Sequence, residues 1–171
     1  VDVDLDTYNI DVAAAASAIT PRTKAIMPVH MAGLIAVMDA LDLSADTGVP
    51  LLQDAAHAHG ARWQGKRVGE LGTVATFSFQ NGKLMTAGEG GALLFPDEET
   101  YEAAFLRHSC GRPRTDRHYL HQTAGTNMRL NEFSASVLRA QLGRLDAQLT
   151  LRDQRWTLLS RLLGEIDGVV P

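Results

Sequence analysis

The sequence contains one cysteine, Cys110, no apolar run as long as a membrane-spanning helix, and no charged-then-apolar segment at its beginning. A single thiol excludes an internal disulfide framework and is typical of a reducing compartment. The formal net charge is only −4, so no excess of either sign points to nucleic acid or to an anionic membrane. We therefore expect a cytoplasmic protein with neither nucleic acid nor a membrane as partner.

Several well-known motifs are also missing. The chain has no Walker loop, no Gly-x-Gly-x-x-Gly after a strand-like run and no Gly-x-Ser-x-Gly, so nucleotide binding and α/β-hydrolase chemistry lose support. The one basic run, residues 112–118, is short and interrupted by proline. It indicates a solvated loop, with contact to a phosphate or carboxylate as the alternative.

The 171 residues are 45% hydrophobic and 21% charged, which is typical of one ordinary globular domain. Apolar strand-like runs alternate with helical patterns. This alternation predicts an α/β fold in three layers, with a mainly parallel sheet covered by helices on both faces. We expect strands at 24–30, 49–54, 74–79 and 91–95, and helices at 11–19, 34–45, 98–107 and from Asn131 to about Leu163, the last weakened or bent at Gly143.

Polar side chains follow the expected strands at their carboxyl ends. His30, Asp54 and Ser78 each end an apolar run, and Lys83 comes five residues after Ser78. Ligands of open parallel sheets bind outside the carboxyl ends of the strands, so we expect these four side chains to lie close to one another.

A lysine and a carboxylate delivered by two strand ends suggest a pyridoxal-phosphate site. Lys83 would carry the cofactor as a Schiff base, which an amine forms only when unprotonated, and Asp54 would hold the ring nitrogen protonated. Residue type alone leaves other interpretations open. Lys83 could be a surface lysine in a glycine-containing turn, and Asp54 could cap a turn.

The surrounding residues fit the same chemistry. Ser78 can donate to a phosphate, His57 lies within reach of the same cofactor, and the glycines of the segment 88–91 let the backbone approach where side chains would clash. Asn127 is either a turn residue or part of the site. His57 and His59, with His30 nearby and Asp54 as a third ligand, leave a metal site as an alternative, as in a metal-dependent hydrolase.

The motifs resemble one known family. Asp54 to Gly60, Phe77-Ser78-Phe79 before the lysine, Gly88 to Gly91 after it, and Asn127 to Leu130 before a long helix are similar to the DegT/DnrJ/EryC1 aminotransferase family of fold-type I pyridoxal-phosphate enzymes. The resemblance covers the whole chain in order and implies a pyridoxal-phosphate transferase-like large domain.

The resemblance also implies roles for five residues. Lys83 would be the catalytic residue that binds the cofactor covalently, Asp54 would bind its pyridine nitrogen, and His57 would lie against its ring. Ser78 would bind the phosphate, and Asn127 would reach the phosphate of the neighbouring subunit of a homodimer with shared active sites. No metal is implied.

The resemblance further implies that residues 1–171 form the central part of the large domain, with an N-terminal segment and a C-terminal small domain outside this chain. The chain opens without methionine, at Val1, which favours a fragment. As a fragment it is expected to be inactive by itself.

Two activities are implied, and the cofactor site alone does not separate them. The first is a lyase (hydro-lyase) of antibiotic biosynthesis, which dehydrates and aromatises 5-amino-5-deoxy-3-dehydroshikimate, a small amino-cyclohexene carboxylate. The alternative is an aminotransferase acting on a keto-sugar or keto-cyclitol. A binding or regulatory protein on the same fold is a third possibility, against which the presence of Lys83 and Asp54 argues.

Overall fold

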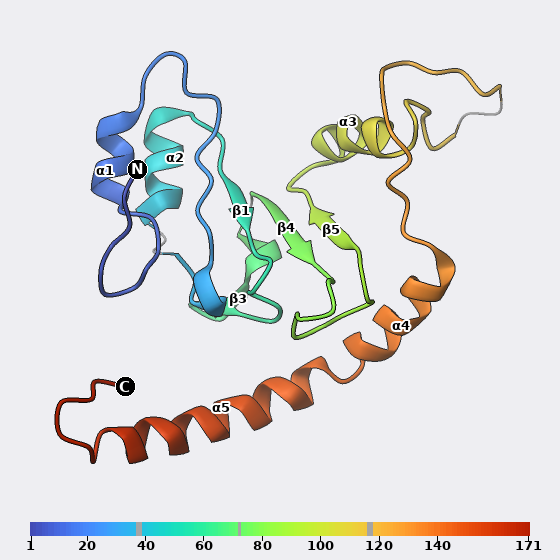
Figure 1. The fold of residues 1–171 in the computed structure, drawn as a ribbon. Helices are drawn as coiled ribbons and strands as arrows, with labels where there is room; N and C mark the ends of the chain where they lie inside the picture. Colours follow the sequence, from blue (N-terminus) through green and yellow to red (C-terminus); the bar gives the residue numbers. More distant parts are fainter. Residues whose placement is uncertain (37–38, 72, 116–117) are drawn as a thin grey trace.

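The computed structural model describes residues 1–36, 39–71, 73–115 and 118–171 (Figure 1). Val37 and Met38 of the expected helix at 34–45, and Asp116 and Arg117 of the basic loop, lie outside these ranges. The central sheet has the order β1–β4–β5, formed by β1 (Leu52–Asp54), β4 (Val74–Ser78) and β5 (Gly91–Leu94). β1 and β4 are parallel, whereas β5 runs antiparallel to β4.

The expected strand at 24–30 is interrupted. The chain pairs with β1 in parallel through two isolated bridges, at Ile26 and at Val29. The Ile26 and His30 amides donate to this neighbour, and the Pro28 carbonyl accepts from Asp54 at 2.9 Å. Proline has no amide hydrogen, so one bond of the ladder cannot form at Pro28. The sheet edge is therefore parallel, as expected, but it is not a continuous strand.

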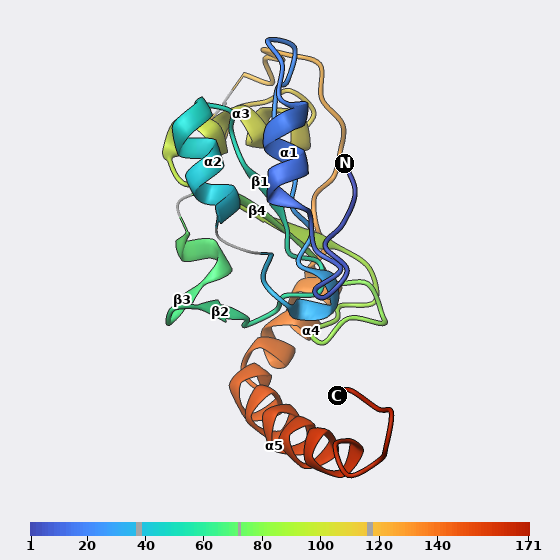
Figure 2. The same ribbon diagram turned by 90° about the vertical axis from the view of Figure 1, so that its left-hand side faces the viewer.

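Two helices lie side by side next to β1 (Figures 1 and 2). In α1 (Val12–Ala18) the Asp11 side chain accepts the Ala14 amide, which caps the helix at the beginning of the range 11–19 that the sequence predicted to be helical. α2 is Asp39–Thr47, a shorter helix than expected. Between these helices and the sheet edge, Ile26 and Leu51 are buried against a set of partly buried apolar side chains: Ile10, Val12, Ile19, Leu43 and Val49.

The segment between β1 and β4 contains short elements. These are the antiparallel pair β2 (Arg62–Trp63) and β3 (Lys66–Arg67), followed by the 3₁₀ turn η2 (Val68–Glu70). A further 3₁₀ turn, η1 (Met31–Gly33), follows His30. Val68 of η2 is only 1% exposed and packs with alanines from β4 and from the segment after β1. The turn-like sequence of this segment does not predict these short elements.

Three helices follow the sheet. α3 (Glu98–His108) is capped by Asp97, whose side chain accepts the Thr100 amide. α4 (Glu132–Leu142) is capped by Asn131, and α5 (Leu145–Leu163) follows it. The single long helix expected from the sequence is thus two helices, with the break at Gly143, where glycine has the weakest helix propensity of any residue except proline.

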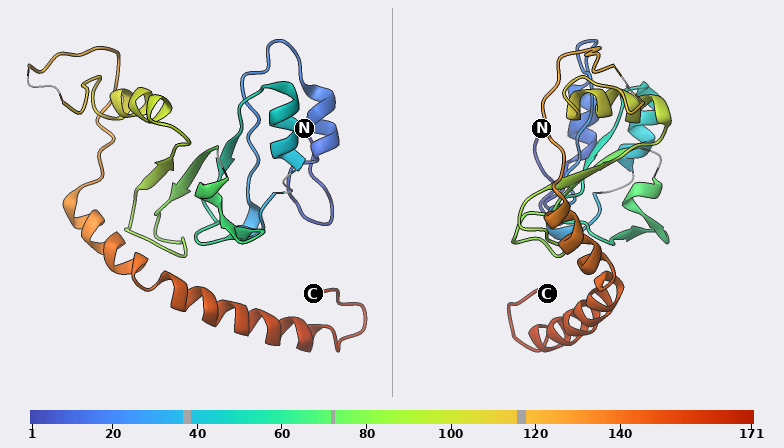
Figure 3. Two further views of the ribbon diagram at one scale, coloured as in Figure 1. Left: turned by 180° about the vertical axis from the view of Figure 1, so that it is seen from behind. Right: turned by 90° about the vertical axis from the view of Figure 1, so that its right-hand side faces the viewer.

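Much apolar surface is exposed. The accessible surface is 11,635 Å², whereas a compact monomer of 18.5 kDa has about 8,200 Å². Figure 3 shows α5 extending past the sheet. Leu145 at the beginning of α5 is buried, but Phe133 of α4 is 88% exposed and Trp156 of α5 is 60% exposed, so much of the apolar surface of these two helices is uncovered. In the described part of the chain no helix is long and apolar enough to cross a membrane.

Candidate active site

The ends of β1 and β4 bring the first candidate residues together. Asp54 pairs with Thr76 in parallel register, and Ser78 ends β4 two residues later. Side chains alternate between the faces of a strand, so Asp54, Thr76 and Ser78 share one face of the sheet. This register agrees with the expectation that the Asp54 carboxylate and the Ser78 hydroxyl lie near each other, at the carboxyl ends of adjacent strands.

Asp54 is half-buried, and one of its carboxylate oxygens accepts the Ala56 amide at 3.0 Å. This bond holds the carboxylate at the beginning of the turn that carries His57 and His59. Asp54 therefore does cap a turn, as the alternative interpretation had it. Capping uses one lone pair of one oxygen, so the same carboxylate can still receive a proton donor such as a pyridine N–H.

Lys83 lies in a tight turn directly after β4. The Gln80 amide donates to Ser78 Oγ at 3.3 Å, the Gly82 amide donates to Gln80 Oε1 at 2.8 Å, and the Lys83 amide donates to the Gln80 carbonyl at 3.0 Å. Lys83 is half-buried. This chain of short-range bonds ties the position of Lys83 to the Ser78 hydroxyl.

The glycines after Lys83 are used as the sequence predicted. Gly88 and Gly90 have φ of +84° and +135°, in the region that favours glycine. A Cβ on Gly91 would lie 2.8 Å from the Phe77 carbonyl oxygen, closer than side chains tolerate. The segment makes both a tight entry into β5 and a close backbone approach to β4.

The histidines have different environments. His57 is exposed at the strand-end turn, where a Cβ on Gly33 would lie 3.1 Å from its carbonyl oxygen. His30 is 2% exposed, and both of its ring nitrogens have partners: Nε2 lies 2.9 Å from Gln53 Oε1, and Nδ1 accepts the Ala36 amide at 3.1 Å. Because both nitrogens bond within the protein, His30 belongs to the fold and not to the group that faces a ligand.

His59 was considered only as a metal ligand in the sequence analysis. It is 3% exposed, and its Nε2 lies 2.9 Å from the Ser78 carbonyl oxygen. Within the described ranges, no group of three or more His, Cys, Asp or Glu residues is arranged to hold a metal ion. The His-x-His pattern therefore combines one exposed ring and one buried ring.

Asn127 comes from a different part of the chain. It is exposed, its backbone pairs with Ser109 at the end of α3, and its side-chain oxygen accepts the Arg129 amide at 3.3 Å. The next residue, Met128, lines a cavity of about 550 Å³ together with Thr76 and Gly91. Phe77 and Ala92 line this cavity too, whereas Asp54, Ser78 and Lys83 do not, so the cavity does not bring Asn127 together with the other candidate residues.

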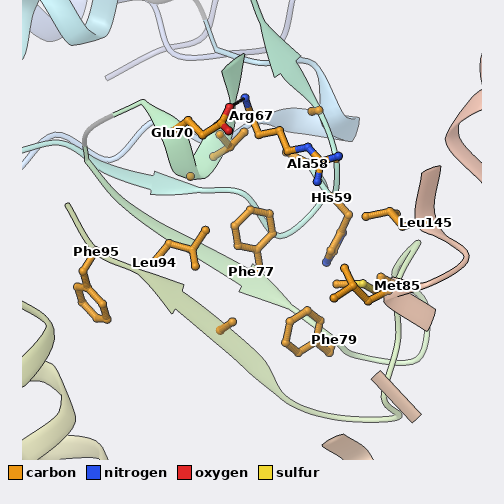
Figure 4. Close-up of a pocket in the computed structure, with 16 residues that line it drawn as sticks. Ala58, His59, Arg67, Glu70, Phe77, Phe79, Met85, Leu94, Phe95 and Leu145 are labelled. Carbon is orange, nitrogen blue, oxygen red and sulfur yellow. Dashed lines mark hydrogen bonds between the residues drawn. The ribbon is translucent and has the colours of Figure 1, made fainter. Parts of the chain in front are cut away.

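A second cavity, of about 490 Å³, lies on the opposite face (Figure 4). Its walls include Phe77, Phe79, Ala92 and Leu94, and the His59 ring lies among them. Phe77 lies next to Ser78 in β4, so its side chain points to the face opposite that of Asp54 and Ser78. Asp54, Ser78 and Lys83 do not line this apolar cavity, so it is separate from the candidate active site.

All 171 residues of the chain match one protein family, described as the DegT/DnrJ/EryC1/StrS aminotransferase family. The chain belongs to this family. Its members depend on pyridoxal phosphate, so the cofactor and the family predicted from the sequence are both confirmed.

The relatives extend the comparison. The 3-amino-5-hydroxybenzoate synthase of Amycolatopsis mediterranei (strain S699) is 79% identical over 174 residues, covering 100% of this chain and 45% of that protein. An L-glutamine:2-deoxy-scyllo-inosose aminotransferase of Streptomyces paromomycinus is 44% identical, covering 96% of this chain and 41% of that protein. The chain therefore spans less than half the length of these relatives.

Solved structures confirm the α/β fold class. A crystal structure of 3-amino-5-hydroxybenzoic acid synthase, 79% identical, superposes with a TM-score of 0.93 over 99% of this chain and 45% of that one. DesV of S. venezuelae, solved in complex with a ketimine intermediate, is 42% identical and gives a TM-score of 0.80 over 86% of this chain and 39% of that one.

The donor set fits pyridoxal phosphate. The sheet end presents a carboxylate suited to a pyridine N–H, a hydroxyl suited to a phosphate and an amine suited to an aldehyde, at Asp54, Ser78 and Lys83. Asp54 and Ser78 lie on one face of adjacent parallel strands, and the glycines at 88–91 keep the neighbouring backbone free of side chains.

Proposed function

We propose that the complete protein containing this chain is a pyridoxal-phosphate-dependent dehydratase. It would convert 5-amino-5-deoxy-3-dehydroshikimate into 3-amino-5-hydroxybenzoate, in antibiotic biosynthesis of the ansamycin type. One observation favours the dehydratase over an aminotransferase. The chain is 79% identical to a 3-amino-5-hydroxybenzoate synthase and 44% identical to the deoxy-scyllo-inosose aminotransferase of S. paromomycinus.

The cofactor, when bound, supplies an electron sink for charge that develops on the carbon bearing the substrate amine. Asp54 holds a proton at the ring nitrogen, which strengthens that sink. Ser78 Oγ donates to the phosphate, and His57 lies against the ring. These roles are supported by the shared face of Asp54 and Ser78 and by the exposure of His57 at the same strand end.

Lys83 has two tasks in this proposal. Its Nζ first holds the cofactor, and then it takes the proton from the amine-bearing carbon of the substrate. The same Nζ returns a proton to the neighbouring hydroxyl, which leaves as water. Tautomerisation, in which a ring carbon gives up a proton and the ring carbonyl oxygen gains one, then gives the aromatic product with no further change in composition, and aromatisation makes this late step strongly favourable.

The active site would be completed by a second copy of the chain in a homodimer. Asn127 is exposed, and so are many apolar side chains of α4 and α5, such as Phe133 and Trp156. A partner's Asn127 would bind the phosphate of this subunit. Together with the single cysteine, the biosynthetic role supports a cytoplasmic location.

The alternative is an aminotransferase that uses the same Lys83 and Asp54 to pass an amine from glutamine or glutamate to a keto-sugar or keto-cyclitol. The 44% identity to a deoxy-scyllo-inosose aminotransferase supports it. The two reactions share the proton removal and separate afterwards, so the cofactor-binding residues do not distinguish them.

The deciding experiment supplies 5-amino-5-deoxy-3-dehydroshikimate, without any amino donor, to the complete gene product loaded with pyridoxal phosphate. The product is followed by mass and by ultraviolet absorption. An aromatic amine one water lighter than the substrate is expected. No reaction, together with glutamine-dependent amination of a keto-cyclitol, would move the protein to the aminotransferase activity.

A further inference from the structure

His59 is a buried histidine that the proposed mechanism does not use. Its ring lies 5.5 Å from that of Phe77 and 6.0 Å from that of Phe79, measured between ring centroids. Figure 4 shows it on the apolar side of the sheet, between Phe77 and Leu145. Its Nε2 reaches the Ser78 carbonyl oxygen at 2.9 Å, so this ring touches the residue whose hydroxyl is assigned to the phosphate.

The bond completes the edge of β4 where β1 has ended. The last backbone bond between the two strands runs from the Ala55 amide to the Thr76 carbonyl, at 2.9 Å. On the other edge, Ser78 pairs with Gly91 of β5. The next carbonyl on the β1 side, that of Ser78, receives the imidazole N–H of His59 in place of a backbone amide.

The protonation state of His59 follows from its surroundings. A carbonyl only accepts, so Nε2 carries the hydrogen, and Nδ1 is buried with no hydrogen-bond partner in the described part of the chain. Burial lowers the pKa of His59, the bond to the Ser78 carbonyl opposes this, and the nearby charges of Lys83 and His57 lower it further. The ring is therefore a neutral donor at neutral pH.

We infer that His59 is a positioning residue that fixes the end of β4 so that the Ser78 hydroxyl meets the cofactor phosphate. The inference rests on the proposed function, because it takes Ser78 as the phosphate ligand.

The test compares His59→Gln with His59→Met in the complete gene product. The two side chains have similar length, and only glutamine supplies an N–H that can reach the Ser78 carbonyl. Binding of pyridoxal phosphate and of pyridoxal, which lacks the phosphate, is measured by absorbance titration of the apoprotein. Val68→Ala is the control, since Val68 is buried in the neighbouring apolar cluster and does not belong to the site.

His59→Met is expected to weaken binding of pyridoxal phosphate about tenfold while leaving pyridoxal binding nearly unchanged. His59→Gln should restore most of the loss, and Val68→Ala should reduce thermal stability without changing the ratio of the two affinities. Combined with Ser78→Ala, His59→Met should add little further loss, because both changes remove the same phosphate contact.

Equal weakening of both ligands by His59→Met, or full additivity with Ser78→Ala, would overturn the inference and leave His59 with a purely structural role. These outcomes are distinct from failure of the proposed function. If the proposed function fails, the wild-type protein gives no aromatic product from the aminodehydroshikimate, whereas the binding titrations need no turnover and still report on His59.

Discussion

Asp54 and Ser78 end two adjacent parallel strands on the same face of the sheet, with Asp54 in register with Thr76. This relationship places a carboxylate and a hydroxyl side by side at the strand ends, and the turn after Ser78 adds Lys83. Strand pairing holds Asp54 and Ser78, and a hydrogen-bonded turn holds Lys83. The proposed chemistry depends on this arrangement, because sites built on strands are more precise than sites built on loops.

Lys83→Ala should abolish turnover, because the amine is both the attachment point and the proton carrier. Loss of a positioned acid–base group alone lowers rates by about 10²–10⁴-fold, and the loss of covalent attachment adds to this. Turnover of the aminodehydroshikimate is the measurement. Lys66→Ala is the matched control, because Lys66 is an exposed lysine of β3 outside the site.

Asp54→Asn should retain cofactor binding but lower turnover by about 10²-fold or more, since the amide cannot hold a proton at the ring nitrogen as a carboxylate does. The amide oxygen can still accept the Ala56 amide, so the strand-end turn is retained. Turnover and the far-ultraviolet spectrum should be recorded together. Unchanged turnover would remove Asp54 from the mechanism, and Asp97→Asn, at the cap of α3, serves as a control.

Gly91→Ala should destabilise the protein by about 1–3 kcal/mol, because the new methyl would lie 2.8 Å from the Phe77 carbonyl oxygen. Gly143→Ala is the contrasting change. Its nearest neighbour would be 3.6 Å away and its φ of −63° suits alanine, so it should be neutral or stabilise by about 0.4–1 kcal/mol. Urea unfolding of both variants checks the pair, and equal effects would contradict the assigned β4–β5 contact.

His30 makes stability depend on pH. Burial lowers its pKa, although the bond to Gln53 and the charge of Asp54 oppose the shift. The folded state then binds fewer protons than the unfolded state, so the stability contribution is present above the unfolded pKa of about 6.5 and is lost as pH falls through the folded pKa.

The free energy of unfolding should accordingly begin to fall as pH drops through about 6.5, the pKa of histidine in the unfolded chain, and His30→Gln should make that decline shallower. Urea unfolding at several pH values provides the measurement. His59 has a pKa lowered in the same direction, so part of the decline should remain. An unchanged slope in His30→Gln would contradict a buried neutral His30.

The sequence was sufficient for the family, the cofactor and the positions of most elements, because each depends on local patterns. The cap at Asp11, the weak point at Gly143 and the glycine approach at Gly91 all follow from rules that act within a few residues. The sequence also contains Pro28, but its effect on the sheet edge could be predicted only with the knowledge that the segment around Pro28 pairs with the segment that contains β1.

The exposure and contacts of the histidines could not be predicted from local sequence patterns. His57 and His59 are two residues apart, yet one is exposed at the strand end and the other is buried against Phe77. Which ring faces the ligand depends on the path of the turn after β1 and on side chains from β4, and these contacts join residues about twenty positions apart. For the same reason, the sequence did not separate His30 from the group that faces the ligand.

The most direct test of the central claim is to identify the lysine that binds the cofactor. The complete gene product is loaded with pyridoxal phosphate, reduced with borohydride and digested, and the modified peptide is found by mass spectrometry. This chain has three lysines, Lys24, Lys66 and Lys83. The account predicts a pyridoxyl group on Lys83 alone among them, and a reduced protein with no modification at Lys83 would contradict it.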